Sequence, residues 1–364
     1  MDLVEAGTPP DLSDLARPLR IVHLVVTDAF AGTERYVANL AGASAHLGHA
    51  VHVIGGNRQR MRAALPREVG LVEAGGLAAA VAALRRVPRP DVIHAHLTAA
   101  EVAAVIAMPR RGPALVSTRH IAARRGSSPA ARAAAVAVRA RLDAQIAVSR
   151  FVAEAVDGAS DVILTGVPDS STSTDSVRQP TVLVAQRLEA EKDTVTALRA
   201  WALSGLAADG WDLTVAGTGA EAARLKEMAT RMGLGATARL VGQVDDLAVR
   251  MASAAVFIAP APAEPLGLSV VEAMSHGLPV VAAGSGGHLE TVGAVPGAML
   301  FPPGDAAAAA AALRSLVAEP ERRRAYGAAL QTHQRRHLSL EAFADQVVEL
   351  YRRALSQARL RLYP

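Results

Sequence analysis

Residues 264–282 read EPLGLSVVEAMSHGLPVVA, and this stretch decides the fold of the second half of the chain. An apolar run precedes it at 254–259 and predicts a short buried strand. Glu264 stands before a proline, which disfavours the α region, so a loop is expected there. A helix is predicted to begin near Gly267 and to end at Gly277, because glycine often follows the last turn of a helix. Pro279 prevents that helix from continuing, and the next strand is expected over 279–283.

The stretch carries two acids in different settings. Glu264 lies on the loop that enters the predicted helix, whereas Glu272 lies within the helix. The backbone N–H groups of Leu266, Gly267 and Leu268 fall at the positive end of the helix, where a phosphate is favoured. An isolated pair of acids is more often a pair of solvent-exposed side chains, so the interpretation depends on neighbouring motifs.

Amino-acid composition limits the classes to which the protein can belong. The chain has 364 residues, enough for two domains, and its 51% hydrophobic content indicates a packed globular protein. It has no cysteine, which excludes disulfides and thiolate metal sites. The net charge of +4 favours an anionic small molecule, a membrane surface or nucleic acid. Nucleic acid is not expected, because zinc-finger spacing is absent and aromatic residues make up only 3%.

Targeting signals are not evident. Residues 1–19 are polar and acidic and predict a disordered leader, without the basic and apolar regions of a signal peptide. No apolar run approaches the length needed to span a membrane, and a cytoplasmic location is expected. Residues 124–141 form a basic segment, but its apolar face is mostly alanine, so we expect little membrane contact.

The order of elements predicts two Rossmann-like domains. A strand at 20–26, a helix at 33–47 and a strand at 50–54 make a right-handed βαβ unit. The N-terminal domain is predicted over 20–168, and residues 169–180, rich in Ser, Thr, Asp and Pro, are predicted to be a linker. The second domain is predicted over 181–339, where strands and helices again alternate. Helical apolar spacing continues from Leu340 towards the C-terminus.

The acids eight positions apart, Glu264 and Glu272, followed by Gly-Leu-Pro-Val-Val-Ala, resemble the Glu-x7-Glu motif of retaining GT-B glycosyltransferases. The family is glycosyltransferase family 4, the glycosyl transferases group 1. Three other segments resemble motifs of the same family: DVIHAH at 91–96, RLEAEK at 187–192 and GSGGHLE at 284–290. The resemblance implies an α/β GT-B fold, two Rossmann-like domains with an interdomain cleft, and a helix at 340–364 that rejoins the first domain.

The resemblance also implies the reaction and its residues. A sugar passes from a nucleotide-diphosphate sugar to an unidentified small-molecule, glycan or lipid-linked acceptor, with retention and with neither metal nor cofactor. The catalytic residues implied are His120, Glu264, Arg187 and Lys192. The residues implied to bind the nucleotide sugar are Gly32, Arg187, Lys192, Gly217, Gly242, Glu264, Leu266, Gly267, Leu268 and Glu272. Arginine and lysine suit the diphosphate because they offer a two-pronged donor and a point charge.

Departures from the family pattern and other interpretations stay open. Ala31 replaces the first glycine of Gly-Gly-x-Glu, and Gln186 replaces the glycine before Arg187. His120 follows a predicted strand and is equally explained as a histidine that hydrogen-bonds the backbone. His94 and His96 share a strand face, but no third metal ligand lies near them in the sequence. A sugar-nucleotide epimerase of GT-B fold, a non-catalytic nucleotide-sugar-binding module and a phosphorylase-like enzyme remain alternatives.

Overall fold

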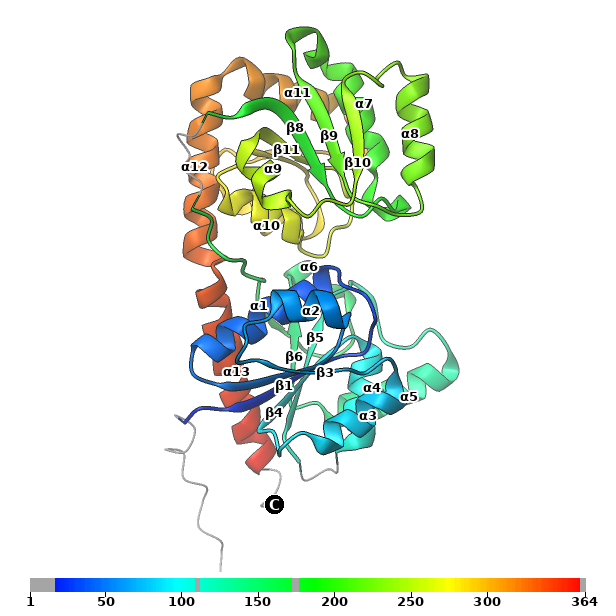
Figure 1. Ribbon diagram of the computed structural model, residues 1–364, viewed down its shortest axis with the longest axis vertical. Coiled ribbons are helices and arrows are strands. Elements are labelled where there is room, and N and C mark those ends of the chain that lie inside the picture. The colour runs from blue at the N-terminus through cyan, green and yellow to red at the C-terminus, as the bar shows by residue number, and fades with distance from the viewer. Residues whose placement is uncertain (1–16, 109–111, 172–176, 361–364) are drawn as a thin grey trace, which may run out of the picture. The chain divides into compact units, whose positions relative to one another are not determined.

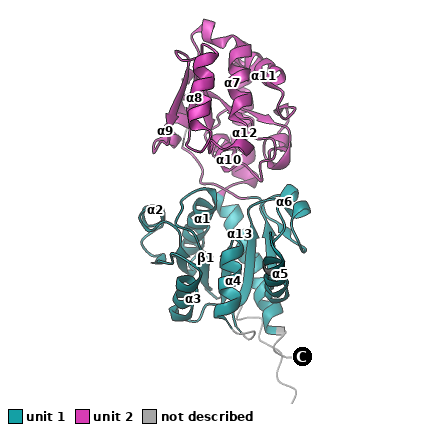
Figure 2. Ribbon diagram, turned by 90° about the vertical axis from the view of Figure 1, so that its right-hand side faces the viewer, with its two compact units in different colours: residues 1–164, 340–364 teal, residues 165–339 magenta. Residues whose placement is uncertain are grey.

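The structure is a computed structural model that describes residues 17–108, 112–171 and 177–360 (Figure 1). The chain divides into two compact units, coloured separately in Figure 2. Unit 1 comprises Met1–Leu164 and Leu340–Pro364, and unit 2 comprises Thr165–Ser339. Most of the predicted leader lies outside the described residues, but Leu19 is fully buried and Arg17 pairs with Asp91 at 2.8 Å. The part of the predicted linker at 172–176 also lies outside them.

Unit 1 is built on a seven-stranded parallel sheet. Its strands are β1 (Arg20–Val25), β2 (Ala50–Gly55), β3 (Gly70–Val72), β4 (Val92–His96), β5 (Ala114–Arg119), β6 (Ala144–Ala147) and β7 (Asp161–Val162). They lie in the order β3-β2-β1-β4-β5-β6-β7, and every pair is parallel. The order of the strands, and not their direction, reverses at β1: β2 and β3 follow on one side of it and β4 to β7 on the other. This arrangement is typical of the doubly wound fold, which binds ligands beyond the carboxyl ends of its strands.

Helices cover both faces of this sheet (Figure 1). They are α1 (Gly32–His46), α2 (Arg58–Ala64), α3 (Leu77–Arg86), α4 (Thr98–Ala107), α5 (Pro129–Arg141), α6 (Arg150–Ala155) and α13 (Leu340–Leu360). One sheet face packs on α3 and α4 through an apolar core that includes Leu24, Ile93 and Leu115. Side chains alternate along a strand, so the strand residues between those of this core face the opposite side of the sheet. Helix α13 contacts α1 and β5. The C-terminal helix therefore belongs to unit 1.

Unit 2 repeats the plan with six parallel strands. They are β8 (Gln179–Ala185), β9 (Asp212–Ala216), β10 (Ala238–Gly242), β11 (Ala254–Ala259), β12 (Val280–Ala283) and β13 (Met299–Phe301). Their order is β10-β9-β8-β11-β12-β13, again with the reversal at the first strand. The helices are α7 (Thr194–Ser204), α8 (Ala222–Arg231), α9 (Leu247–Ser253), α10 (Leu268–Ser275), α11 (Ala306–Ala318) and α12 (Pro320–His337). Short 3-10 turns include η2 (Ala190–Lys192) and η4 (Gly286–Leu289).

The prediction of two Rossmann-like α/β domains is confirmed. The helix predicted between Gly267 and Gly277 is α10, and Gly277 adopts the left-handed conformation, with φ of 61°, after its last turn. Ser128 caps α5, since its Oγ accepts from the Ala131 N–H at 3.2 Å. Within the described ranges, no helix is both long enough and apolar enough to cross a membrane.

Candidate donor and acceptor sites

The loop that carries Glu264 enters α10 through a left-handed glycine. Gly267 has φ of 91° and is the N-cap residue of α10. A Cβ at this position would lie 3.2 Å from the His288 ring and 3.4 Å from Glu264 Cγ. Both the backbone conformation and the space therefore favour glycine. Leu266 is buried and anchors the loop, which leaves the first N–H groups of α10 at the carboxyl end of β11.

A second loop, at 284–288, holds the Glu264 loop by its backbone. The Gly287 N–H donates to the Glu264 carbonyl oxygen at 2.8 Å. A Cβ on Gly287 would lie 2.6 Å from the Pro265 carbonyl oxygen, and one on Gly286 would lie 2.5 Å from the Glu264 carbonyl oxygen. The two glycines thus permit an approach that any side chain would block. We call residues 264–268 and 284–288 the acid clip.

Lys192 is the partner of Glu264. Its ammonium lies 2.5 Å from Glu264 Oε2, and the two side chains are only 15% and 16% exposed. Lys192 ends the turn η2, and the next residue, Asp193, takes a left-handed conformation and caps α7 through its carboxylate. The sequence placed these two residues in separate motifs, and the fold brings them together as one partly buried ion pair.

His288 lies behind the pair and was not among the predicted site residues. It is 1% exposed, and its Nδ1 lies 3.1 Å from the Ala283 carbonyl oxygen. Burial lowers the pKa of His288, Glu264 opposes this, and Lys192 reinforces it. A neutral imidazole, which keeps Nδ1–H towards the carbonyl, therefore lines the acid clip at neutral pH. The only sign of it in the sequence is its position in the glycine-rich motif at 284–290.

The remaining predicted residues of unit 2 lie at neighbouring strand ends. Arg187 follows β8, is 57% exposed and ion-pairs with Glu191 at 2.9 Å, so the structure does not join it to Glu264. Gly217, after β9, donates its N–H to the Gly242 carbonyl oxygen of β10 at 2.8 Å. A Cβ on Gly217 would overlap the Gln186 carbonyl oxygen, so this glycine shapes the loop that carries Arg187. Glu272 is half-buried, one turn along α10 from Leu268.

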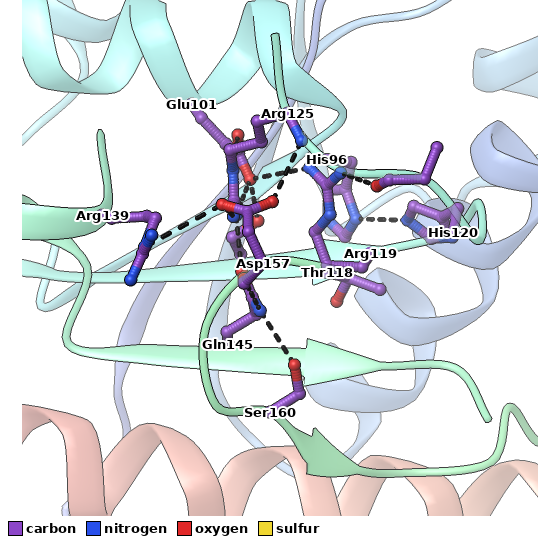
Figure 3. Close-up of polar contacts among 12 residues, drawn as sticks. His96, Glu101, Thr118, Arg119, His120, Arg125, Arg139, Gln145, Asp157 and Ser160 are labelled. Carbon is purple, nitrogen blue, oxygen red and sulfur yellow. Dashed lines mark hydrogen bonds and ion pairs between the residues drawn. The ribbon is translucent and has the colours of Figure 1, made fainter. Parts of the chain in front are cut away.

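In unit 1, His120 follows β5 directly. Its Nε2 lies 3.2 Å from His96 Nδ1 (Figure 3). Its ring meets the Tyr36 ring edge-on with centroids 4.7 Å apart. Burial, and next the Arg119 guanidinium, lower the pKa of His120 to about 3. His120 is therefore a neutral imidazole at neutral pH. Gly32 is exposed at the first position of α1, while Glu34 turns inward and binds the Ala31 N–H at 2.8 Å.

The loop after His120 is tied down by a buried arginine. Figure 3 shows Arg125 between Glu101 and Asp157, with Gln145 beside them. Arg125 Nη2 lies 2.6 Å from Glu101 Oε1, and both side chains are 0% exposed. Arg125 Nη1 lies 3.0 Å from Asp157 Oδ2. These bonds fix the course of the loop that follows His120.

Comparisons with known proteins identify the family. A family model described as Glycosyl transferases group 1 matches residues 170–333, and one described as Glycosyltransferase Family 4 matches residues 30–167. Together they span both units. The chain belongs to glycosyltransferase family 4 of the group 1 glycosyl transferases, as its motifs predicted.

Curated relatives match only short segments. A probable sucrose-phosphate synthase 5 of Oryza sativa is 48% identical over 67 residues, which cover 18% of this chain and 7% of the relative. The sulfoquinovosyl transferase SQD2 of Arabidopsis thaliana is 42% identical over 92 residues, covering 24% of this chain and 18% of the relative. The matches thus concern a segment and not the length of these proteins.

Solved structures match the fold over most of the chain. HepE of Anabaena, in complex with UDP and glucose, has a TM-score of 0.73 at 20% identity and covers 91% of this chain and 99% of its own. A sucrose-phosphate synthase from Thermosynechococcus elongatus has a TM-score of 0.73 at 22% identity, with coverage of 91% and 98%. These likenesses establish the GT-B fold that was predicted.

Proposed function

We propose that the protein is a retaining glycosyltransferase that moves a sugar from a nucleotide-diphosphate sugar to an acceptor. The observation that carries the proposal is the Lys192–Glu264 pair, held by the acid clip at the N-terminus of α10. It combines a cation, a carboxylate and unsatisfied backbone donors at the carboxyl ends of parallel strands. A diphosphate joined to a polyhydroxyl sugar needs these same groups.

Stabilisation of the leaving group is assigned to fixed positive groups. Lys192 and the N–H groups of Leu266, Gly267 and Leu268 would neutralise the diphosphate as its bond to the sugar breaks. The exposed Arg187 would leave Glu191 and add a bidentate contact. With this arrangement a divalent ion at the diphosphate is not required. The finding that HepE was solved with UDP and glucose supports a nucleotide-sugar donor.

The carboxylates have separate roles in the proposal. Glu264 binds hydroxyls of the transferred sugar once Lys192 turns to the phosphates, and no covalent nucleophile is assigned. Glu272 accepts hydrogen bonds from the nucleotide ribose, while Gly217 and Gly242 leave the neighbouring strand ends open for the base. His120 acts on the reacting sugar as a neutral imidazole. The proposal includes a cytoplasmic location, which cell fractionation tests.

A panel of UDP-, GDP-, TDP- and ADP-sugars in a thermal-shift assay tests donor binding. A ligand that binds only the folded state stabilises it and so raises the melting temperature. At a free concentration of a hundred times its dissociation constant, the ligand adds about 2.7 kcal/mol to the free energy of unfolding. We expect one nucleotide to stand out. If none shifts the transition, the donor site is refuted.

Turnover assays separate the reaction from its alternatives. A glycosyltransferase releases the nucleoside diphosphate only in proportion to the sugar transferred to an added acceptor, and retention gives a product with the donor's anomeric configuration. A sugar-nucleotide epimerase would convert the donor without an acceptor. A binding module would bind the donor and leave it unchanged across an acceptor library.

A further inference from the structure

Three histidines of unit 1 form a hydrogen-bonded chain that ends at His120. His23 Nδ1, on β1, lies 3.2 Å from Nε2 of His96, the last residue of β4. His96 Nδ1 in turn lies 3.2 Å from His120 Nε2 (Figure 3). His23 and His96 are 0% exposed, whereas His120 is half-buried, so the chain runs from the core of unit 1 towards its surface. We call His23, His96 and His120 the imidazole chain.

His94 lies beside the imidazole chain and is not part of it. Its Nδ1 lies 2.6 Å from the Tyr351 hydroxyl, and its Nε2 lies 2.6 Å from the Thr118 hydroxyl. Both nitrogens are therefore taken, and neither is left for a neighbouring imidazole or for a metal ion. The imidazole chain thus has a single route, in which each histidine contacts the next through one pair of nitrogens.

Each link of the imidazole chain needs one donor and one acceptor. A neutral imidazole carries a proton on one ring nitrogen, and the other nitrogen accepts. Burial lowers the pKa of all three histidines, to about 3 for His23 and His120, so their rings are neutral at neutral pH. If His23 donates through Nδ1, His96 accepts at Nε2 and donates through Nδ1, and His120 accepts at Nε2. The protons are therefore ordered in one of two directions along the chain.

The two ends of the imidazole chain decide between these directions. Within the described ranges, His23 Nε2 is buried and has no hydrogen-bond partner. Buried N–H donors without a partner are rarer in proteins than buried acceptors that lack one, so Nε2 is favoured as the bare nitrogen and the proton belongs on Nδ1. At the other end, the ring of His120 makes its one hydrogen bond to a described residue through Nε2. A proton on His120 Nδ1 is therefore left for a ligand.

Ring contacts keep the imidazole chain in this arrangement. The Tyr36 ring lies edge-on to both His96 and His120, with centroids 5.5 Å and 4.7 Å away, and it limits the rotation of both imidazoles. A ring that does not turn keeps the same nitrogen towards its neighbour. Hydrogen bonds in a row also polarise one another, which favours a single direction throughout.

We propose that His23 and His96 are positioning residues that hold His120 in the tautomer with its proton on Nδ1. All three members of the imidazole chain then carry the proton on Nδ1, and each Nε2 is bare. His120 consequently offers a ligand a hydrogen-bond donor and not a base. A hydroxyl oxygen of the transferred sugar is the partner that suits this donor, and this last step rests on the proposed function.

Nitrogen NMR reads the tautomers without substrate, so its outcome does not depend on whether the protein transfers a sugar. In the whole protein with isotope-labelled histidine, a protonated ring nitrogen and a bare one resonate far apart. At neutral pH we expect a protonated Nδ1 and a bare Nε2 in His23, His96 and His120. A bare Nδ1 in His120, or an even mixture of the two tautomers, would overturn the proposal.

His96→Leu removes the link and tests the positioning role. A free neutral imidazole populates both tautomers, so the ring nitrogens of His120 should move to averaged positions in this variant. The matched control is His46→Gln, which removes an exposed histidine of α1 outside the imidazole chain and should leave the tautomer of His120 unchanged. Wild-type positions of the His120 signals in His96→Leu would show that His96 does not set the tautomer. Should His96→Leu fail to fold, the tautomers of the three wild-type histidines decide.

Turnover tests the contact between His120 and the sugar. Asparagine places an amide N–H near the position of Nδ1, whereas glutamine places one near Nε2. His120→Asn should therefore keep about tenfold more of the turnover than His120→Gln, the worth of one hydrogen bond. Equal rates in the two variants would overturn the contact between Nδ1–H and the sugar, and the NMR result would still decide the tautomer.

Discussion

Replacement of Lys192 by methionine separates its structural role from its role in the reaction. Methionine is unbranched and nearly as long as lysine but carries no charge, so it leaves Glu264 without the ammonium that lies 2.5 Å away. A hydrogen bond to a charged group contributes about 1.5–3 kcal/mol to stability. Because the pair is only 15–16% exposed, solvent screens it little, and a loss within that range is expected for unit 2.

The chain offers its own probe for this loss. Both tryptophans, Trp201 and Trp211, lie in unit 2, so their fluorescence in a urea titration reports the unfolding of that unit. Lys192→Met combined with Glu264→Gln removes both charges and should restore part of the loss. The control is Arg231→Met, which breaks an exposed ion pair with Glu227 and should cost under about 1 kcal/mol.

Turnover supplies the second measurement. If Lys192 stabilises the leaving group, Lys192→Met lowers kcat by about a hundredfold to a thousandfold, the cost of losing one transition-state donor. Lys192→Arg, which keeps the charge, should retain more of the rate. A variant that loses stability but turns over within a few-fold of the wild type would refute the assignment. Lys192 would then serve only to hold Glu264.

Four further results are expected. Glu272→Ala should weaken nucleotide binding at least about tenfold in calorimetry, because one charge-assisted hydrogen bond is worth about 1.5–3 kcal/mol; an unchanged dissociation constant would remove Glu272 from the site. His120→Ala should lower kcat more than donor affinity, and normal turnover with a verified acceptor would make His120 structural. Excess EDTA should leave the rate nearly unchanged, whereas Arg187→Ala should lower it about a hundredfold. If EDTA abolishes activity and magnesium or manganese restores it, the assignment of a metal-free leaving-group site is refuted. Burial holds the pKa of His288 below its unfolded value of 6.5, so the unfolded state binds the extra proton. Stability of unit 2 should therefore be full above pH 6.5 and fall below it, by up to about 1.4 kcal/mol per pH unit for this group. In urea titrations His288→Gln should show a smaller dependence, the remainder coming from His276 and His333, whose pKa values burial also lowers.

The strands and the helix at the donor site were predictable because their signals are local. The apolar run at 254–259 and the glycine and proline at 277 and 279 each specify backbone conformation within a few residues. The structure places β11, α10 and β12 where these signals predicted them. By contrast β3 has only three residues, and α3 and α4 are rich in alanine. Their patterns of apolar and polar residues are therefore weak, and the sequence did not predict these three elements.

Contacts between distant residues could not be predicted from local patterns. Lys192 and Glu264 are 72 residues apart, and His23 and His96 are 73 apart. Both pairs depend on the order of strands in a sheet, which single-sequence periodicity does not give. The imidazole chain was not predicted for this reason: His23 becomes a neighbour of His94 and His96 only when β1 pairs with β4.

Hydrogen exchange tests, without knowledge of the acceptor, whether the acid clip and Lys192 hold the nucleotide sugar. The donor selected by thermal shift is added, and amide exchange is followed by mass spectrometry. Slower exchange is expected at 264–268, 284–288 and the turn that ends in Lys192, because the ligand engages the N–H groups at the start of α10. Unchanged exchange in these segments, with protection elsewhere in the chain, would contradict it.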